Sequence, residues 1–173
     1  MPLPPLAAED HVCGLCGFSF AALGVEEARS LIEVLPERYR SAVAGMPDGA
    51  LRRRPAPGVW SPIEYLCHVR DVYVSHLVRL YRSRTEEDPG VEPMFNDLRA
   101  RRLHYDERDA GATLDELEAA VAGLLEESRR FQPDQWARTV HRLPGESRTA
   151  RWLLRNAAHE GIHHLRDLSS PAA

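Results

Sequence analysis

The sequence contains no lysine, so all 22 of its Lys and Arg residues are arginine. This absence excludes any mechanism that needs a lysine nucleophile or a lysine Schiff base. The sequence also lacks a stretch near the roughly 18 apolar residues of a membrane-spanning helix. The start Met1-Pro2-Leu3-Pro4-Pro5, with acidic residues close behind, is unlike a secretory signal peptide. We therefore expect a cytoplasmic protein with no membrane partner.

The sequence also lacks an excess of positive charge, because 22 basic residues stand against 26 acidic ones and the formal net charge at pH 7 is -4. A general nucleic-acid binder is normally basic, so we expect no nucleic-acid partner. The run Arg52-Arg53-Arg54 is short and is better explained as a solvated loop. The three cysteines are too few for a disulfide framework. The length of 173 residues suits one domain with a sizeable core.

Hydrophobic periodicity predicts four long helices. They span about residues 26–45, 62–82, 113–131 and 149–168. Pro36 interrupts the first of them and is expected to begin a new turn, because proline suits a first helical position. Runs that alternate polar and apolar residues are too short to indicate a real sheet.

Start signals support three of these helices. Ser61-Pro62-Ile63-Glu64 is a capping box with proline at the first helical position. Thr113-Leu114-Asp115-Glu116 is a second capping box, and Thr149 is expected to cap the last helix.

Four helices with long connections predict an all-α fold, a four-helix bundle. The connections carry Pro and Gly and span residues 46–59, 85–112 and 132–148, with one short helix expected at Asn96–His104. Residues 1–24 are predicted to form an irregular N-terminal arm, and residues 25–170 the bundle.

The last predicted helix carries several metal-binding side chains. His159 and His163 are four residues apart, so they lie on one helical face and can bind one metal ion. His68 lies on a polar strip of the second helix, and it completes a three-His site if both strips face a common cleft. Three protein ligands leave a coordination position open, which is typical of a reactive site. His164 is rotated about 100° from His163 and is expected to point away.

These residues carry a resemblance to a known family. Trp60-Ser61-x-x-Glu64-x-x-x-His68-x-x-Asp71, followed by His159-x-x-x-His163-His164-x-x-Asp167, resembles the DinB/YfiT-like metalloprotein superfamily over about residues 26–168. The resemblance implies an up-down-down-up four-helix bundle that holds zinc, nickel or a similar divalent ion. It also implies that His68, His159 and His163 are the ligands. The family includes S-transferases that use mycothiol, bacillithiol or glutathione, among them mycothiol-dependent maleylpyruvate isomerase.

Glu160 has two interpretations, as an acid or base beside the metal or as an ordinary exposed helix residue. His159-Glu160-x-x-His163 also matches the motif of zincin proteases. Only ten residues follow His163, which is too few for the usual downstream ligand of those enzymes. Asp71 and Asp167 either orient imidazoles or pair with neighbouring arginines.

The segment Cys13-Gly14-Leu15-Cys16-Gly17 resembles one zinc knuckle. A structural zinc needs four ligands, so three interpretations stay open. The pair binds a second zinc with histidines such as His11, His104 or His141; it is a redox pair; or it is a reduced pair on a mobile arm that could also cover the cleft.

The first functional hypothesis is a thiol-dependent S-transferase. The metal would bind the sulfur of a low-molecular-weight thiol of the mycothiol type and lower its pKa, so that the thiolate attacks a small electrophile. Arg70, Arg151 and Arg155 are candidates to hold the carboxylate or sugar groups of that thiol. The alternatives are a metal-dependent hydrolase and a non-catalytic metal- or ligand-binding bundle of a stress response. A bundle of this size is also compatible with a homodimer.

Overall fold

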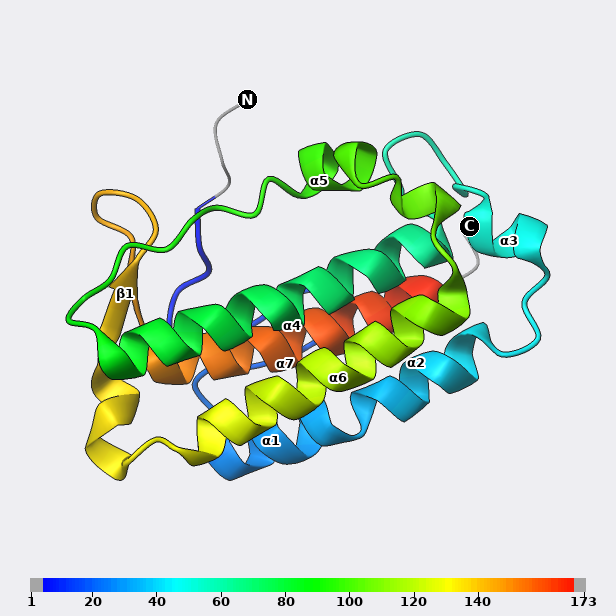
Figure 1. Ribbon diagram of the computed structural model, residues 1–173. Helices are drawn as coiled ribbons and strands as arrows, with labels where there is room; N and C mark the ends of the chain where they lie inside the picture. The colour runs from blue at the N-terminus through cyan, green and yellow to red at the C-terminus, as the bar shows by residue number, and fades with distance from the viewer. Residues whose placement is uncertain (1–4, 170–173) are drawn as a thin grey trace.

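Four long helical segments form the body of the protein in the computed structural model, which describes residues 5–169. The first segment is divided into α1 (Val25–Glu33) and α2 (Leu35–Val43), and the others are α4 (Pro62–Thr85), α6 (Ala110–Arg129) and α7 (Ala150–Ser169). Figure 1 shows that the first and last segments run in one direction and that α4 and α6 run in the opposite direction. This confirms the predicted up-down-down-up four-helix bundle.

The break between α1 and α2 lies where the sequence predicts it. Val34 ends α1, and Pro36 stands in the first turn of α2. Because proline has no backbone N–H to donate, it fits a first turn and not a helix interior. Both short helices pack against α6 and α7, and α4 completes the bundle by packing against the same two helices.

The predicted starts of α4 and α7 are confirmed, and that of α6 is wrong. Glu64 accepts hydrogen bonds from the Ser61 N–H and hydroxyl, both at 2.8 Å. The N–H of residue 152 donates to the Thr149 hydroxyl at 3.0 Å. For α6 the cap is Asp109, four residues before Thr113, whose hydroxyl instead donates to the Asp109 carbonyl.

The connections contain more structure than the sequence indicates. The short helix α5 (Asn96–Arg102) was expected, whereas α3 (Asp48–Arg52) and the 3₁₀ turns η1 (Tyr105–Glu107) and η2 (Pro133–Ala137) were not. A small antiparallel hairpin of β1 (Thr139–His141) and β2 (Ser147–Thr149) also forms, although no sheet was predicted. Its strands have three residues each, which is too short for a period of two to stand out in the sequence.

The core fills the space between these helices and contains two tyrosines whose hydroxyl groups donate to α7. The Tyr39 hydroxyl donates to the Gly161 carbonyl at 2.8 Å, and the Tyr73 hydroxyl donates to the Ala157 carbonyl at 3.0 Å. Both tyrosines are fully buried. These bonds fix the rotation of α7 against its neighbours, and so fix the direction of its polar side chains.

Asp71 is part of a buried charged network and does not orient an imidazole. Its carboxylate pairs with Arg70 at 2.6 Å, with Arg99, and with the hydroxyl of Tyr105. Burial alone would raise the pKa of Asp71, but Tyr105 and the two guanidinium groups hold it below its usual value. Arg70 also pairs with Glu116, so it is engaged in the bundle wall.

The described part of the N-terminal arm lies along α7 and the hairpin (Figure 1). Glu9 accepts from the N–H and hydroxyl of Thr149, and Arg155 donates to the Leu23 carbonyl. Phe20 is fully buried and stacks on Trp152. No helix of the described residues is long and apolar enough to cross a membrane.

Candidate metal centre

Three side chains from α4 and α7 converge beside the bundle core. Glu160 and His164 lie one turn apart on α7, and His68 faces them from α4. Glu160 Oε2 is 3.4 Å from His68 Nε2 and 3.4 Å from His164 Nε2. One donor atom from each of the three residues lies within 4.8 Å of the others. Two imidazoles and one carboxylate therefore face a common point.

Neighbouring side chains hold both imidazoles in place. The His164 Nδ1–H donates to Asp167 Oδ2 at 2.7 Å, which leaves its Nε2 facing Glu160. The ring of Tyr65 stacks on His164, and the ring of Trp60 meets His68 edge-on with centroids 5.1 Å apart. The expectation that Asp167 orients an imidazole therefore fits the geometry, with His164 as its partner.

The electrostatics of this set favour a cation. Burial would raise the pKa of Glu160, but the imidazoles of His159, His164 and His68 hold it well below its usual value. Burial would lower the pKa of His164, but Asp167 and Glu160 raise it to about 9. The carboxylate is therefore ionised at neutral pH, and the imidazole beside it carries a proton that a metal ion would replace.

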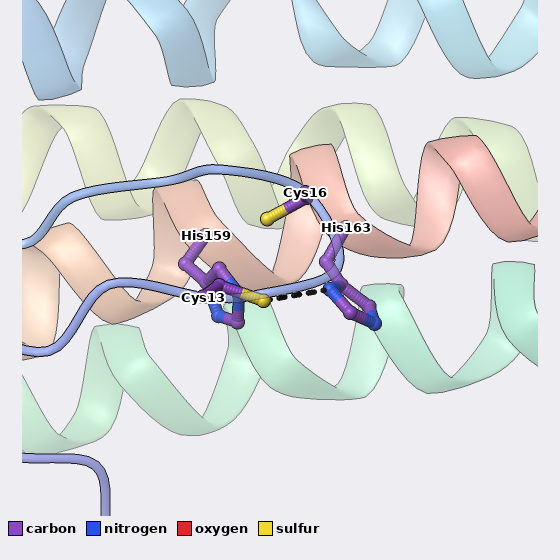
Figure 2. Close-up of side chains that lie close together, drawn as sticks. All are labelled: Cys13, Cys16, His159 and His163. Atoms are coloured by element: carbon purple, nitrogen blue, oxygen red, sulfur yellow. Dashed lines mark hydrogen bonds between the residues drawn. The ribbon is translucent and has the colours of Figure 1, made fainter.

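A second set of four side chains joins the N-terminal arm to α7. Cys13 and Cys16 come from a turn of the arm, and His159 and His163 lie one turn apart on α7 (Figure 2). One donor atom from each residue lies within 4.8 Å of the other three. The Cys13 sulfur is 3.6 Å from His163 Nδ1. Burial would raise the pKa of Cys13, but the backbone N–H of Cys16 and the imidazole of His159 lower it to about 5.

The structure thus divides the predicted ligands between two places. His159 and His163 lie with the cysteines, whereas His68 lies with Glu160 and His164. His164 points in a different direction from His163, toward His68 and Glu160. Consecutive helical positions differ by about 100°, and this rotation separates the two pairs on α7.

The remaining histidines lie elsewhere. His104 and His141, named above as partners of the cysteines, instead approach Glu107 and Asp88. Among the described residues, neither they nor His11 belong to a group of possible metal ligands. His76 donates from Nδ1 to the Val72 carbonyl at 2.8 Å, and burial lowers its pKa to about 4.

A cleft of about 790 Å³ opens beside His68 and Glu160. Its described lining comes from the N-terminal arm, α4, residues 94–98, α5, α7 and the turn between β1 and β2, and it includes His76, Asn156 and His159. The arginines that line it are Arg79, Arg101 and Arg142. The arginines suggested by the sequence, Arg70, Arg151 and Arg155, are not part of this lining.

The fold and the site together define the class of protein: a four-helix bundle with a cluster of possible metal ligands beside a cleft. Residues 31–168 match the model of the DinB superfamily, and the chain belongs to that superfamily. The resemblance noted in the sequence is thereby confirmed.

Two solved structures share this fold. YfiT from Bacillus subtilis, described as a probable metal-dependent hydrolase with an unusual four-helix bundle topology, aligns over 84% of this chain and 85% of its own, at 21% identity and a TM-score of 0.76. The mycothiol-dependent maleylpyruvate isomerase aligns over 89% of this chain but only 64% of its own, at 21% identity and a TM-score of 0.69.

One relative is similar in sequence over a shorter stretch. A protein of Geobacillus thermodenitrificans named "Putative metal-dependent hydrolase" is 31% identical over 74 residues. The match spans 43% of this chain and 42% of that relative, so this chain covers less than half of its length.

Proposed function

We propose that this protein is a metal-dependent hydrolase that acts on a small molecule in the cleft, with His68, Glu160 and His164 as ligands of one divalent ion. The observation that carries the proposal is the donor set itself. Two imidazoles and a carboxylate leave a coordination position open, and this combination is typical of zinc hydrolases. The names of YfiT and of the Geobacillus relative support the same class.

The residues fit such an ion. Nitrogen and oxygen ligands 2.0–2.2 Å from one zinc ion in a tetrahedron lie about 3.3–3.6 Å apart. Both contacts of Glu160 with the imidazole nitrogens measure 3.4 Å. Hydrogen bonds between charged groups are usually shorter, at about 2.7–2.9 Å, so the spacing suits a shared ion better than a direct ion pair.

The residues around the proposed ion have distinct roles. Asp167 fixes the tautomer of His164 by accepting its Nδ1–H, as carboxylates beside metal-bound histidines commonly do. Glu160 brings a negative charge that balances half of the charge of a divalent ion. When bound, such an ion lowers the pKa of water and polarises the bond to be hydrolysed.

The cleft favours a substrate that carries a carboxylate or a similar anionic group. Arg101 has no ion pair or hydrogen bond within the described residues, and it is exposed at the cleft. Arg79 lines the same space, and its guanidinium donates to the Glu92 carbonyl. Arginine binds carboxylates through two parallel hydrogen bonds, so these groups would orient the substrate relative to His68 and Glu160.

Thiol-dependent S-transfer is the second candidate, with zinc or nickel as the ion and a mycothiol-type thiol as co-substrate. The specific observation in its favour is the shared fold with mycothiol-dependent maleylpyruvate isomerase. The carboxylate ligand favours hydrolysis over this candidate, because carboxylates suit hard ions whereas thiolate binding is a property of soft ones. A non-catalytic binding bundle is the third outcome of the test below.

We also propose that the chain forms a homodimer through α4. Val74, Val78 and Tyr81 are about half exposed and follow one another at helical spacing on this helix. A contiguous apolar stripe of this kind is typical of a protein interface. Sedimentation analysis of the wild type beside Val78→Glu tests this: a dimer that becomes monomeric is expected, and a monomeric wild type contradicts it.

The functional test compares the purified metal-free protein with the same protein reloaded with zinc or nickel. It is assayed against small esters and amides that carry a carboxylate, with and without a low-molecular-weight thiol. The proposal predicts metal-dependent turnover without thiol, reduced at least 100-fold in His164→Ala and unchanged in the exposed control His104→Ala. Turnover only with thiol favours the S-transferase, and metal binding without any turnover favours the non-catalytic bundle.

A further inference from the structure

Cys13, Cys16, His159 and His163 form a cluster that the DinB superfamily match does not account for. The match begins at residue 31, so both cysteines lie outside it. Figure 2 shows the two thiols on the turn of the arm and the two imidazoles on α7 facing the same space. The cluster shares no residue with the set proposed for hydrolysis, although His159 Nδ1 lies 3.8 Å from Glu160 Oε1 of that set.

We propose that these four residues bind a zinc ion in a closed structural site that fastens the N-terminal arm to α7. Two thiolates and two imidazoles are a common ligand set of structural zinc, and they leave no position open for a substrate. Two thiolates also neutralise the charge of Zn²⁺, which suits a site where Cys13 is only 7% exposed.

The imidazole of His159 points to a missing partner. Both ring nitrogens of His159 are buried, and neither makes a hydrogen bond in the described structure; Glu160 Oε1 lies 3.8 Å from Nδ1, too far for a hydrogen bond. A buried polar atom without a hydrogen-bond partner has lost its hydration without compensation, so such atoms are rare and require an explanation. A zinc ion between His159 and the thiols would bind one of these nitrogens directly.

The distances agree with a tetrahedral ion. A sulfur at about 2.3 Å and a nitrogen at about 2.05 Å from one zinc ion lie about 3.6 Å apart in a tetrahedron. The Cys13 sulfur lies 3.6 Å from His163 Nδ1. All four donor atoms lie within 4.8 Å of one another, so small side-chain rotations are enough to bring them around one ion.

The turn that presents the thiols is held by its own backbone. The Gly17 N–H donates to the Cys13 carbonyl at 2.8 Å, and the Cys13 N–H donates to the Phe18 carbonyl at 2.9 Å. Gly17 has a φ of +73°, which glycine adopts without a steric penalty. Arg166 of α7 donates to the Leu15 carbonyl at 2.5 Å, so the turn is aligned with the helix that carries the imidazoles.

The arm held in this way forms one wall of the cleft. Pro5, Leu6, Ala7 and His11 of the arm all line it. Of these residues, His11 is closest in sequence to the cysteines, two residues before Cys13. An ion at the cysteines would therefore add to the contacts of Glu9 and Phe20 that already hold this wall, although it would take no part in the reaction itself.

The test uses the double variant His68→Ala/His164→Ala, which removes two ligands of the other set and so keeps the two proposals distinguishable. After reconstitution with zinc we expect one zinc per chain and an X-ray absorption spectrum with two sulfur and two nitrogen ligands. Adding Cys16→Ser should remove that zinc, whereas adding Cys67→Ser should retain it, because Cys67 lies in the buried core away from the arm. Circular dichroism confirms that each variant is helical, and His163→Ala replaces Cys16→Ser if the latter does not fold.

A helical double variant that binds no zinc, or a spectrum without sulfur ligands, would overturn the site. The fastening role has its own readout, because removal of zinc should increase proteolytic cleavage within residues 5–24 at least tenfold. Unchanged cleavage would show that the arm is held without the ion and would overturn that role.

Discussion

Gly161 directly follows Glu160 on α7 and faces the bundle core. Its substitution by alanine tests the packing that orients the metal-binding side chains of this helix. A Cβ at this position would lie 2.4 Å from Leu35 Cδ1 and 2.6 Å from the Tyr73 hydroxyl oxygen. Neither neighbour can move freely, since both are fully buried and the hydroxyl donates to the Ala157 carbonyl. The methyl group must therefore displace core side chains or shift α7.

One stabilising and two destabilising effects set the change in the free energy of unfolding for Gly161→Ala. Alanine is favoured over glycine in a helix interior by about 1 kcal/mol. Overpacking a buried core costs about 1–3 kcal/mol, and loss of the hydrogen bond from Tyr73 leaves a buried hydroxyl unpaired at about 1–3 kcal/mol. Together these terms predict that the free energy of unfolding falls by about 1–5 kcal/mol.

Urea unfolding followed by circular dichroism measures this change. Gly123→Ala in α6 is the matched control, because its Cβ would meet only the end of the Leu77 side chain, at 3.1 Å. The control should be as stable as the wild type or up to about 1 kcal/mol more stable. A Gly161→Ala variant at least as stable as the wild type would refute the proposed packing of α7.

Three further predictions concern charge, metal support and the arm. Because the folded-state pKa of Asp71 is depressed, the stability that its ionised form contributes is fully present above the unfolded pKa of about 3.9 and is lost as the pH falls through the lower folded-state pKa. Asp71→Asn should therefore lower the free energy of unfolding by roughly 3 kcal/mol at pH 7 and by less at pH 3, as urea titrations at both pH values will show; an equal loss at both would contradict the ionised pair. Asp167→Asn should weaken metal binding by about 10–100-fold in a competition titration with a chelator, and unchanged affinity would contradict its role. Phe20→Ala should lower the free energy of unfolding by about 3–5 kcal/mol, since the ring is fully buried against Trp152; a loss below about 1 kcal/mol would show that the arm is not packed as described.

Local signals were sufficient for the helices. The Ser61 capping box, the break at Pro36 and the cap at Thr149 act through contacts within a few residues, so the sequence alone predicts them. The box at Thr113 fails because Asp109, four residues earlier, caps the helix by accepting from the Ala112 N–H. Two possible N-cap residues lie four positions apart, and the sequence alone does not show which of them caps the helix.

The arrangement of the ligands depends on the rotation of α7, which is a property of the whole bundle. His159/His163 and Glu160/His164 have the same spacing of four residues, so the periodicity cannot say which pair faces α4. Burial of Gly161 against Tyr39 and Tyr73 decides it. The pairing of the cysteines with α7 is a contact between residues about 150 positions apart, which no local pattern encodes.

The most direct test of the proposed metal centre is an anomalous difference map from crystals grown with zinc, measured at the zinc absorption edge. We predict a peak within about 2.0–2.2 Å of His68 Nε2, His164 Nε2 and a carboxylate oxygen of Glu160. A peak that instead joins His68 to His159 and His163, or no peak between α4 and α7 in zinc-saturated crystals, would contradict the account.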